Sequence, residues 1–358
     1  MGNISPSPSK PALVFGSSGI NGPEAFNCIT ALITTDKLHF VSGLDFIESS
    51  QGVLDQRLKD QVSYLETVTS LYFSAYVMNI VPEEEIQLST GMLEKAVRAI
   101  EKLSPEFQVL VLPTGVNVCV WVHLLGNFPF KNNLLLKEPH PDIPEPHRSR
   151  LFYTYQHKLL QSLSKGKSWT YLDVRPNIII GFFPNNNAHN LAQWLALYLT
   201  LYRKIYGEGE EVLSPGTKSW TTQSNGSSQD IIDRFAIWAS LHPESSAWQI
   251  FNVADNSQPI SWSVKWPIVC RYFGLKGVAP TDGPGPVPAE FLCEHQDEWL
   301  AMEKERGLQT GHLVGGDRSI PYVPRLLISE FDFDRPLDLT KTHQTWGDAK
   351  EELDVQGT

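Results

Sequence analysis

The segment that decides the fold is Ala12-Leu-Val-Phe-Gly-Ser-Ser-Gly-Ile-Asn-Gly-Pro23. An apolar run is followed by three glycines at intervals of three, and Pro23 then stands where a helix begins, since its missing N–H costs nothing in a first turn. A strand, a glycine turn and a helix start in this order are typical of dinucleotide-binding folds, where the helix N-terminus faces the phosphates. The pattern predicts a cofactor-binding turn made by Gly16, Ser18, Gly19, Ile20 and Gly22.

Apolar strands and amphipathic helices alternate after this turn. Strands that are apolar on both faces and alternate with helices indicate a parallel sheet covered by helices on both sides. We therefore predict an α/β fold, a Rossmann-type doubly wound sheet, over residues 11–183. The expected strands cover residues 37–43, 71–77, 108–112 and both sides of Arg175-Pro176, and the expected helices cover 23–33, 53–59, 90–103 and 150–163.

Three further segments complete the predicted domain organisation. Residues 184–328 are expected to form a mixed substrate-binding lid over the carboxyl ends of the strands, with helices at 190–206, 230–241 and 263–273. Residues 1–10 are predicted to be a disordered leader. Residues 329–358 are polar and acidic, and are predicted to be a flexible tail.

The composition excludes several classes of protein. The 358 residues carry a formal net charge of −11, which argues against a nucleic-acid partner because phosphate binding requires a basic face. No signal peptide precedes the first strand, and the longest uncharged apolar helix candidate is too short to span a bilayer. The four cysteines are far apart, and the two histidines of the proline-rich loop, His140 and His147, fit no metal template. We expect a soluble, cytoplasmic protein without a metal or membrane partner.

Asp45 allows two interpretations of the cofactor site. It lies 23 positions after Gly22, where a second strand ends in an acid that binds a ribose 2′-hydroxyl, which would make the cofactor NAD. Alternatively, the segment Ser42-Gly-Leu-Asp-Phe-Ile-Glu48 belongs to the third strand, and Asp45 contacts the adenine. The second strand is then absent and the first βαβ unit is shortened. No arginine precedes Arg57, so a 2′-phosphate lacks a local partner. A turn or helix cap is a third role for Asp45.

Several segments, in their order and spacing, resemble the progesterone 5β-reductase/iridoid synthase-like branch of the short-chain dehydrogenase/reductase superfamily. The closest similarity is to fungal members from secondary metabolism. The resemblance extends from about Ala12 to Gly277. Besides the glycine turn, it rests on Ser42–Asp45, Leu71–Tyr76, Leu112–Gly115, Leu151–Gln156, Val174–Gly181 and Ile250–Asp255, followed by Trp262 and Trp266.

The resemblance implies an NADPH-dependent reductase acting on the C=C bond of enones or enals. In the family a tyrosine and a lysine stabilise the enolate oxygen, which a phenol donor beside a cation can do. Tyr153 matches the tyrosine, whereas Asn117 stands at the lysine position. His157 lies one helical turn beyond Tyr153 and could polarise it, although a solvent-facing position is the simpler interpretation. Thr114 and Pro176 are assigned to the cofactor site.

We therefore predict an NAD(P)H-dependent reductase of a small hydrophobic, α,β-unsaturated carbonyl compound, with NADP(H) or NAD(H) as cofactor. The missing lysine leaves two alternatives open. One is a non-redox cyclase or isomerase on the same scaffold, and the other is a catalytically silent binding protein or an incomplete gene model. An apolar substrate chamber is the predicted place of Phe182, Phe183, Trp194, Tyr198 and Trp220. A buried helix seam explains Trp194 and Tyr198 equally well.

Overall fold

The computed structural model describes most of the chain outside the glycine turn and several loops. The leader, the turn and Asp45 lie outside the described residues. The described residues are 12–15, 38–41, 49–76, 79, 81–116, 135–138, 145–181, 191–217, 219–282, 285–308, 328–329, 331 and 333–354.

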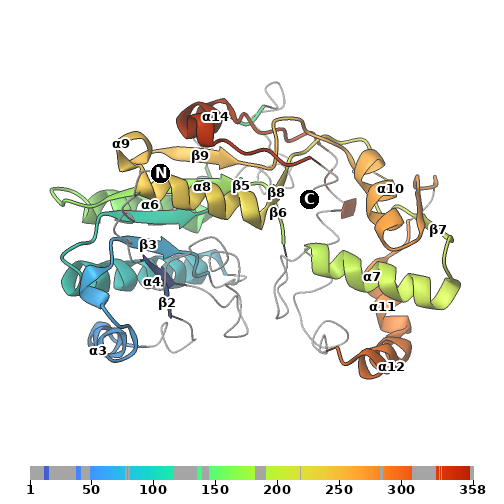
Figure 1. Cartoon of the computed structure of the whole chain (residues 1–358), viewed down its shortest axis with the longest axis horizontal. Coiled ribbons are helices and arrows are strands. Elements are labelled where there is room, and N and C mark those ends of the chain that lie inside the picture. The colour runs from blue at the N-terminus through green and yellow to red at the C-terminus, as the bar shows by residue number, and fades with distance from the viewer. Residues whose placement is uncertain are drawn as a thin grey trace, which may run out of the picture.

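A parallel sheet of six strands forms the centre of the described structure, in the order β2-β1-β3-β4-β5-β9 (Figure 1). Every neighbouring pair in it is parallel, so each connection is a crossover, and the chain reverses its winding direction at β1. The predicted doubly wound α/β sheet is confirmed. The strands are β1 (Ala12–Phe15), β2 (Leu38–Val41), β3 (Ser70–Phe73), β4 (Val109–Pro113), β5 (Thr170–Pro176) and β9 (Ile250–Val253).

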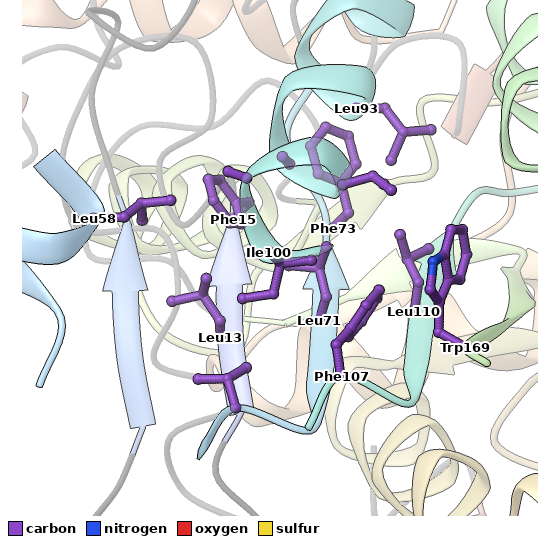
Figure 2. Packing of buried hydrophobic residues seen from close by; sticks show 14 of the residues in the cluster. Leu13, Phe15, Leu58, Leu71, Phe73, Leu93, Ile100, Phe107, Leu110 and Trp169 are labelled. Carbon is purple, nitrogen blue, oxygen red and sulfur yellow. The ribbon is translucent and has the colours of Figure 1, made fainter. Parts of the chain in front are cut away.

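Helices cover both faces because side chains alternate along each buried strand. On β3, Leu71 and Phe73 point toward α3 (Gln51–Gln61), α4 (Pro82–Leu103) and α6 (Phe152–Leu163), the side shown in Figure 2. Tyr72 points the other way, toward α8 (Gln229–Leu241). The apolar pattern of the strands therefore positions both helical layers.

The helix α4 begins eight residues earlier than the sequence pattern indicates. Pro82 occupies its first turn, and Glu83, Glu84 and Glu85 follow directly. Proline is pre-organised for a helix start, and carboxylates there interact favourably with the helix dipole. The acidic run is thus a helix N-terminus, and it places Glu85 near the carboxyl end of the sheet.

The strand β2 pairs directly with β1, with Phe15 opposite Val41. In the common nucleotide-binding order 3-2-1-4-5-6, the strand beside the central one is the second strand, which precedes the ribose-binding acid. Asp45 follows Val41 by four positions. The pairing therefore favours Asp45 as the residue after the second strand rather than the third. In the order 3-2-1-4-5-6 the third strand would lie beyond the second. No described strand lies beyond β2, so the third strand is the one missing from the described sheet.

The helices α7 (Leu191–Tyr206), α10 (Trp262–Tyr272), α11 (Pro288–Glu294) and α12 (Gln296–Arg306) build a second lobe, seen on the right in Figure 1. Trp194 and Tyr198 are almost fully buried in its core, so the helix-seam interpretation of these two aromatic residues is correct. No helix in the described ranges has the length and apolar character needed to cross a membrane. Two small parallel sheets pair β6 (Ile178–Ile180) with β8 (Gly226–Ser228) and β7 (Glu211–Leu213) with β10 (Lys276–Val278).

The prediction of a flexible C-terminal tail is wrong for residues 333–354. This segment contains α14 (Thr340–Trp346) and lies against the sheet. Trp346 is buried, and its ring meets Phe235 of α8 edge-on at a centroid distance of 5.2 Å. The acidic composition concealed an alternating pattern in which Phe331, Phe333, Arg335, Leu337 and Leu339 are all buried.

Side chains from this segment and from Glu138 close the free edge of β9. Thr342 Oγ1 donates to the Asn252 carbonyl at 2.6 Å, and Lys341 Nζ donates to the Ile250 carbonyl at 2.8 Å. Glu138 accepts a hydrogen bond from the Asn252 N–H. An unpaired sheet edge is a template for aggregation, so these bonds complete the sheet as a further strand would.

Replacing Thr342 with valine is expected to lower the free energy of unfolding by about 1–3 kcal/mol, because the buried Asn252 carbonyl loses its partner. Urea unfolding measures the effect. Thr345→Val, the same change at a less buried position of α14, is the control and should cost much less. Equal losses in both variants would show that the bond to β9 is not the cause.

Candidate functional site

Charged and polar side chains cluster where β4 and β5 end. Thr114 follows β4, Asp173 and Arg175 point to the same face of β5, and His157 comes from α6. The carboxyl ends of parallel strands next to the point where the winding reverses are the usual ligand site of doubly wound sheets. The topology therefore brings these four residues to the expected position of an active site.

Asp173 is the centre of this cluster and is completely buried. Its Oδ1 accepts a hydrogen bond from Thr114 Oγ1 at 2.5 Å. Its Oδ2 lies 2.7 Å from Arg175 Nε and 3.0 Å from His157 Nε2. Three partners on two oxygens satisfy the carboxylate, as a buried charge requires.

The environment keeps Asp173 ionised. Burial alone would raise the pKa of its carboxyl group, but the Arg175 charge and the hydrogen bonds from His157 and Thr114 hold the pKa below its usual range. A cation and several hydrogen-bond donors stabilise the ionised carboxylate by more than burial destabilises it. The site thus holds a fixed negative charge beside the Arg175 guanidinium.

Tyr153 stands next to this charge pair on α6. Its ring contacts that of Phe152 at a centroid distance of 4.1 Å, and Phe152 stacks on Tyr76 at 5.1 Å. Burial raises the pKa of the Tyr153 hydroxyl, the negative charges of Asp173 and Glu85 raise it further, and Arg175 opposes them. The phenol therefore stays protonated at neutral pH and can act as a hydrogen-bond donor.

Glu85 contacts Tyr76, which lies after β3 and forms one end of the aromatic stack Tyr76–Phe152–Tyr153. It accepts a hydrogen bond from the Tyr76 hydroxyl at 2.6 Å. Burial and this carboxylate both raise the pKa of Tyr76, so its proton stays on the phenol oxygen. Because the Tyr76 hydroxyl is used in this bond, Tyr153 is the tyrosine of the stack that can donate to a ligand. None of the hydrogen bonds among the described residues involves its hydroxyl.

Glu138 extends the charged cluster toward β9. Burial raises its pKa to about 8, although the charges of Lys341 and Arg175 act in the opposite direction. Arg175 therefore lies within electrostatic reach of two acids, Asp173 and Glu138. The Arg175 guanidinium is oriented by the hydrogen bond of its Nε to Asp173.

The structure brings three of the predicted site residues to this region. Tyr153 lies beside the charge cluster, Thr114 donates to Asp173, and the Pro176 carbonyl accepts a hydrogen bond from Val116 N–H. The hydroxyl of Thr114 is thus engaged inside the protein. The remaining predicted residues lie outside the described ranges: Asn117, Gly16, Ser18, Gly19, Ile20, Gly22 and Asp45.

The interpretation of His157 as a solvent-facing residue is wrong. Its side chain is only 19% exposed and its Nε2 contacts Asp173 rather than Tyr153. Asp173 and Arg175 were not among the predicted site residues. A charged residue inside the apolar strand segment 171–174 is a signal that points to Asp173. Among the described residues, no cluster of His, Cys, Asp or Glu suits a metal ion.

The fold and the site define a Rossmann-type protein of the short-chain dehydrogenase/reductase class. The sequence profile of the PRISE-like Rossmann-fold domain matches residues 23–357. The chain belongs to this family. The resemblance recognised from the sequence motifs is therefore confirmed.

Known relatives agree with this assignment. The short chain dehydrogenase sirQ of Leptosphaeria maculans is 28% identical over 371 residues, covering 95% of this chain and 92% of that protein. A 3-oxo-Delta(4,5)-steroid 5-beta-reductase of Arabidopsis thaliana is 26% identical over 255 residues, covering 70% and 62%. The structure of a GDP-mannoheptose C4 reductase from Campylobacter jejuni with NADP bound has a TM-score of 0.57, 10% identity and coverage of 98% and 96%. At that identity the structural likeness shows the fold alone.

Proposed function

We propose that the protein is an NAD(P)H-dependent reductase of a small hydrophobic, α,β-unsaturated carbonyl compound in secondary metabolism. The observation that carries this proposal is the position of the protonated Tyr153 beside the Arg175–Asp173 pair at the carboxyl ends of β4 and β5. The sirQ-like dehydrogenases and the plant steroid reductase named above support the same reaction class.

The side chains suit the chemistry of conjugate reduction. A bound reduced nicotinamide would supply a hydride to the β-carbon, and the electron pair of the C=C bond would move toward the carbonyl oxygen. Tyr153 would donate a hydrogen bond to that oxygen as negative charge develops on it, and the α-carbon would then take a proton from water. A donor placed where charge develops is the largest single contribution in many enzymes.

Arg175 is our candidate for the positive charge that the family obtains from lysine. Asn117 carries no charge, whereas Arg175 lies close enough to Tyr153 to lower the pKa of its hydroxyl. A guanidinium cannot lose its proton in the working pH range, so it stabilises an enolate only through its charge and its hydrogen bonds. In this proposal Tyr153 is the catalytic donor and Asp173 is a positioning residue that orients Arg175.

The sheet order also suits a nicotinamide cofactor. The glycine segment 16–22 begins directly after β1, at the point where the winding of the sheet reverses. These glycines would hold the pyrophosphate, and Asp45 after β2 would bind the adenosine ribose. An acid in that position favours NAD(H), whereas the family resemblance favours NADP(H), so the two cofactors are compared directly in the test.

Titration with NADPH and NADH, followed by nicotinamide fluorescence, is expected to show micromolar binding of at least one of them. Gly19→Val should abolish the binding, because a side chain there prevents close approach of the backbone to the pyrophosphate. Oxidation of the bound cofactor is then followed with a panel of enones and enals. Turnover of a substrate without any cofactor, together with absent NAD(P)H binding, would overturn the proposal and favour a cyclase or isomerase.

A further inference from the structure

Arg335 is a fully buried cation that has no ion-pair partner among the described residues. It occupies an inward position of the alternating C-terminal segment and is 1% exposed. Its guanidinium lies over the rings of Phe331 and Phe333, at 4.6 and 5.8 Å from their centroids. A buried arginine in an apolar position is costly unless its charge is paired.

Within the described part of the chain, this guanidinium uses little of its hydrogen-bonding capacity. Its Nη1 makes one long hydrogen bond, 3.4 Å, to the Phe333 carbonyl, and its Nε has no partner among the described residues. An arginine carries five N–H donors, and those on Nε and one Nη form an edge that matches a carboxylate or phosphate. The Nε donor, which has no partner among the described residues, is therefore one that an anion could engage.

Lys265 on α10 is a second cation close to Arg335. Burial and the charge of Arg335 lower the pKa of Lys265 to about 8, and the opposing effect of Asp255 is smaller. The two segments also flank the same residue, since Ser224 forms bridges with both Arg335 and Ile260, just before α10. Lys265 is only partly buried, so the pair borders solvent.

The nearby acids are hydrogen-bonded to backbone N–H groups rather than to the two cations. Asp255 accepts a hydrogen bond from the Ser228 N–H at 2.7 Å, and Asp334 accepts one from the Gln223 N–H at 2.7 Å. Among the described residues, neither Arg335 nor Lys265 forms an ion pair. The charges of Asp255 and Asp334 act on Lys265 and Arg335 without a direct ion pair, so an anion could still approach the donors of both cations.

This cation pair is linked to the candidate active site by hydrogen bonds. Leu337, two residues after Arg335, donates its N–H to Asn225 Oδ1 at 2.7 Å. The Asn225 carbonyl accepts from Asn177 Nδ2 at 3.0 Å, and Asn177 directly follows β5. The pair therefore lies on the side of the sheet where the substrate of the proposed reaction would bind.

We infer that Arg335 and Lys265 form a binding site for an anionic group, a carboxylate or a phosphate, carried by the substrate. The assignment of the anion to the substrate rests on the proposed function. The anion site itself does not, because binding of phosphate or acetate tests it without any reaction. The substrate would then be a hydrophobic molecule with one acidic group at a distance from its carbonyl.

The first test uses inorganic phosphate and acetate as probes, at constant ionic strength against chloride. A saturable rise in Tm and a titration heat are expected for the wild-type protein, since a ligand of the folded state stabilises it. Lys265→Met should weaken binding by about tenfold or more, and Arg335→Met should abolish it. Arg234→Met, which removes an exposed arginine of α8 that pairs with Glu351, is the matched control and should bind normally.

Equal responses of all variants would show a general salt effect and overturn the site, as would no response of the wild type to either anion. Should Arg335→Met fail to fold, Lys265→Met decides alone. The second test compares an enone carboxylic acid with its methyl ester. Preference for the acid in wild type, lost in Lys265→Met, supports a substrate anion. If neither compound is reduced, the proposed function fails while the phosphate and acetate titrations still decide the site.

Discussion

Tyr153→Phe is expected to lower kcat for enone reduction by about 10²–10³-fold, the usual cost of removing one donor to a developing oxyanion. The phenol hydroxyl is protonated at neutral pH because burial, Asp173 and Glu85 all raise its pKa. Phenylalanine keeps the stack on Phe152 and removes only the hydroxyl. NAD(P)H fluorescence titrations should therefore be unchanged, and the loss should appear in kcat rather than in cofactor affinity.

Tyr155→Phe is the matched control for this variant. Tyr155 lies on the same helix, two residues further along, but its hydroxyl donates to the Ser149 carbonyl on the exposed side. Its removal should leave kcat within about twofold, as is usual for surface changes. Should Tyr153→Phe retain full activity, or should both variants lose activity equally, Tyr153 would not be the donor.

The sequence contains most of the information that specifies the sheet. Strands such as β3 and β4 are apolar on both faces, and α4 has an apolar stripe, so periodicity alone predicts a parallel sheet between two helical layers. The C-terminal segment follows the same rule, with Phe331 to Leu339 alternating, but the acids between them and an inward Arg335 concealed the pattern. The burial of every second side chain in this segment shows its strand-like character.

The site could be predicted only where a single side chain carries a family motif. Tyr153 was predicted from such a motif, and the structure places it beside Asp173 and Arg175. The partners of Asp173 come from three separated places, β4, β5 and α6, and no local spacing relates Thr114 to His157. Such a contact is decided by strand order and by how α6 packs on the sheet, which is tertiary information. The helix at residues 150–163 was therefore predicted correctly, whereas the predicted solvent-facing position of His157 on that helix was wrong.

Asp173→Asn is expected to reduce the free energy of unfolding by about 3–5 kcal/mol at pH 7, the typical cost of removing one partner from a buried ion pair. The change keeps the shape of the side chain but leaves the Arg175 guanidinium, 16% exposed, without its counter-charge. The asparagine side chain would still reach Thr114, so the loss reports the missing charge. Urea unfolding of both proteins at pH 7 measures it.

The pH dependence identifies the cause. The pKa of Asp173 is lower in the folded protein than in the unfolded chain. Its stabilising contribution is thus fully present above the ordinary aspartate pKa of about 3.9, and is lost as the pH falls through the lower folded-state value. The stability difference between wild type and Asp173→Asn should therefore be constant from pH 7 to about pH 5 and shrink below about pH 4.

Asp282→Asn provides the control, because Asp282 is exposed in a loop and forms no ion pair among the described residues. It should change the unfolding free energy by less than about 0.5 kcal/mol. A stability difference for Asp173→Asn that stayed the same down to pH 3 would show that packing, not charge, is lost. Because the same carboxylate orients Arg175, a true loss of charge should also lower kcat, and Asp173→Glu should not restore it, since the longer side chain displaces the carboxylate from Thr114 and Arg175.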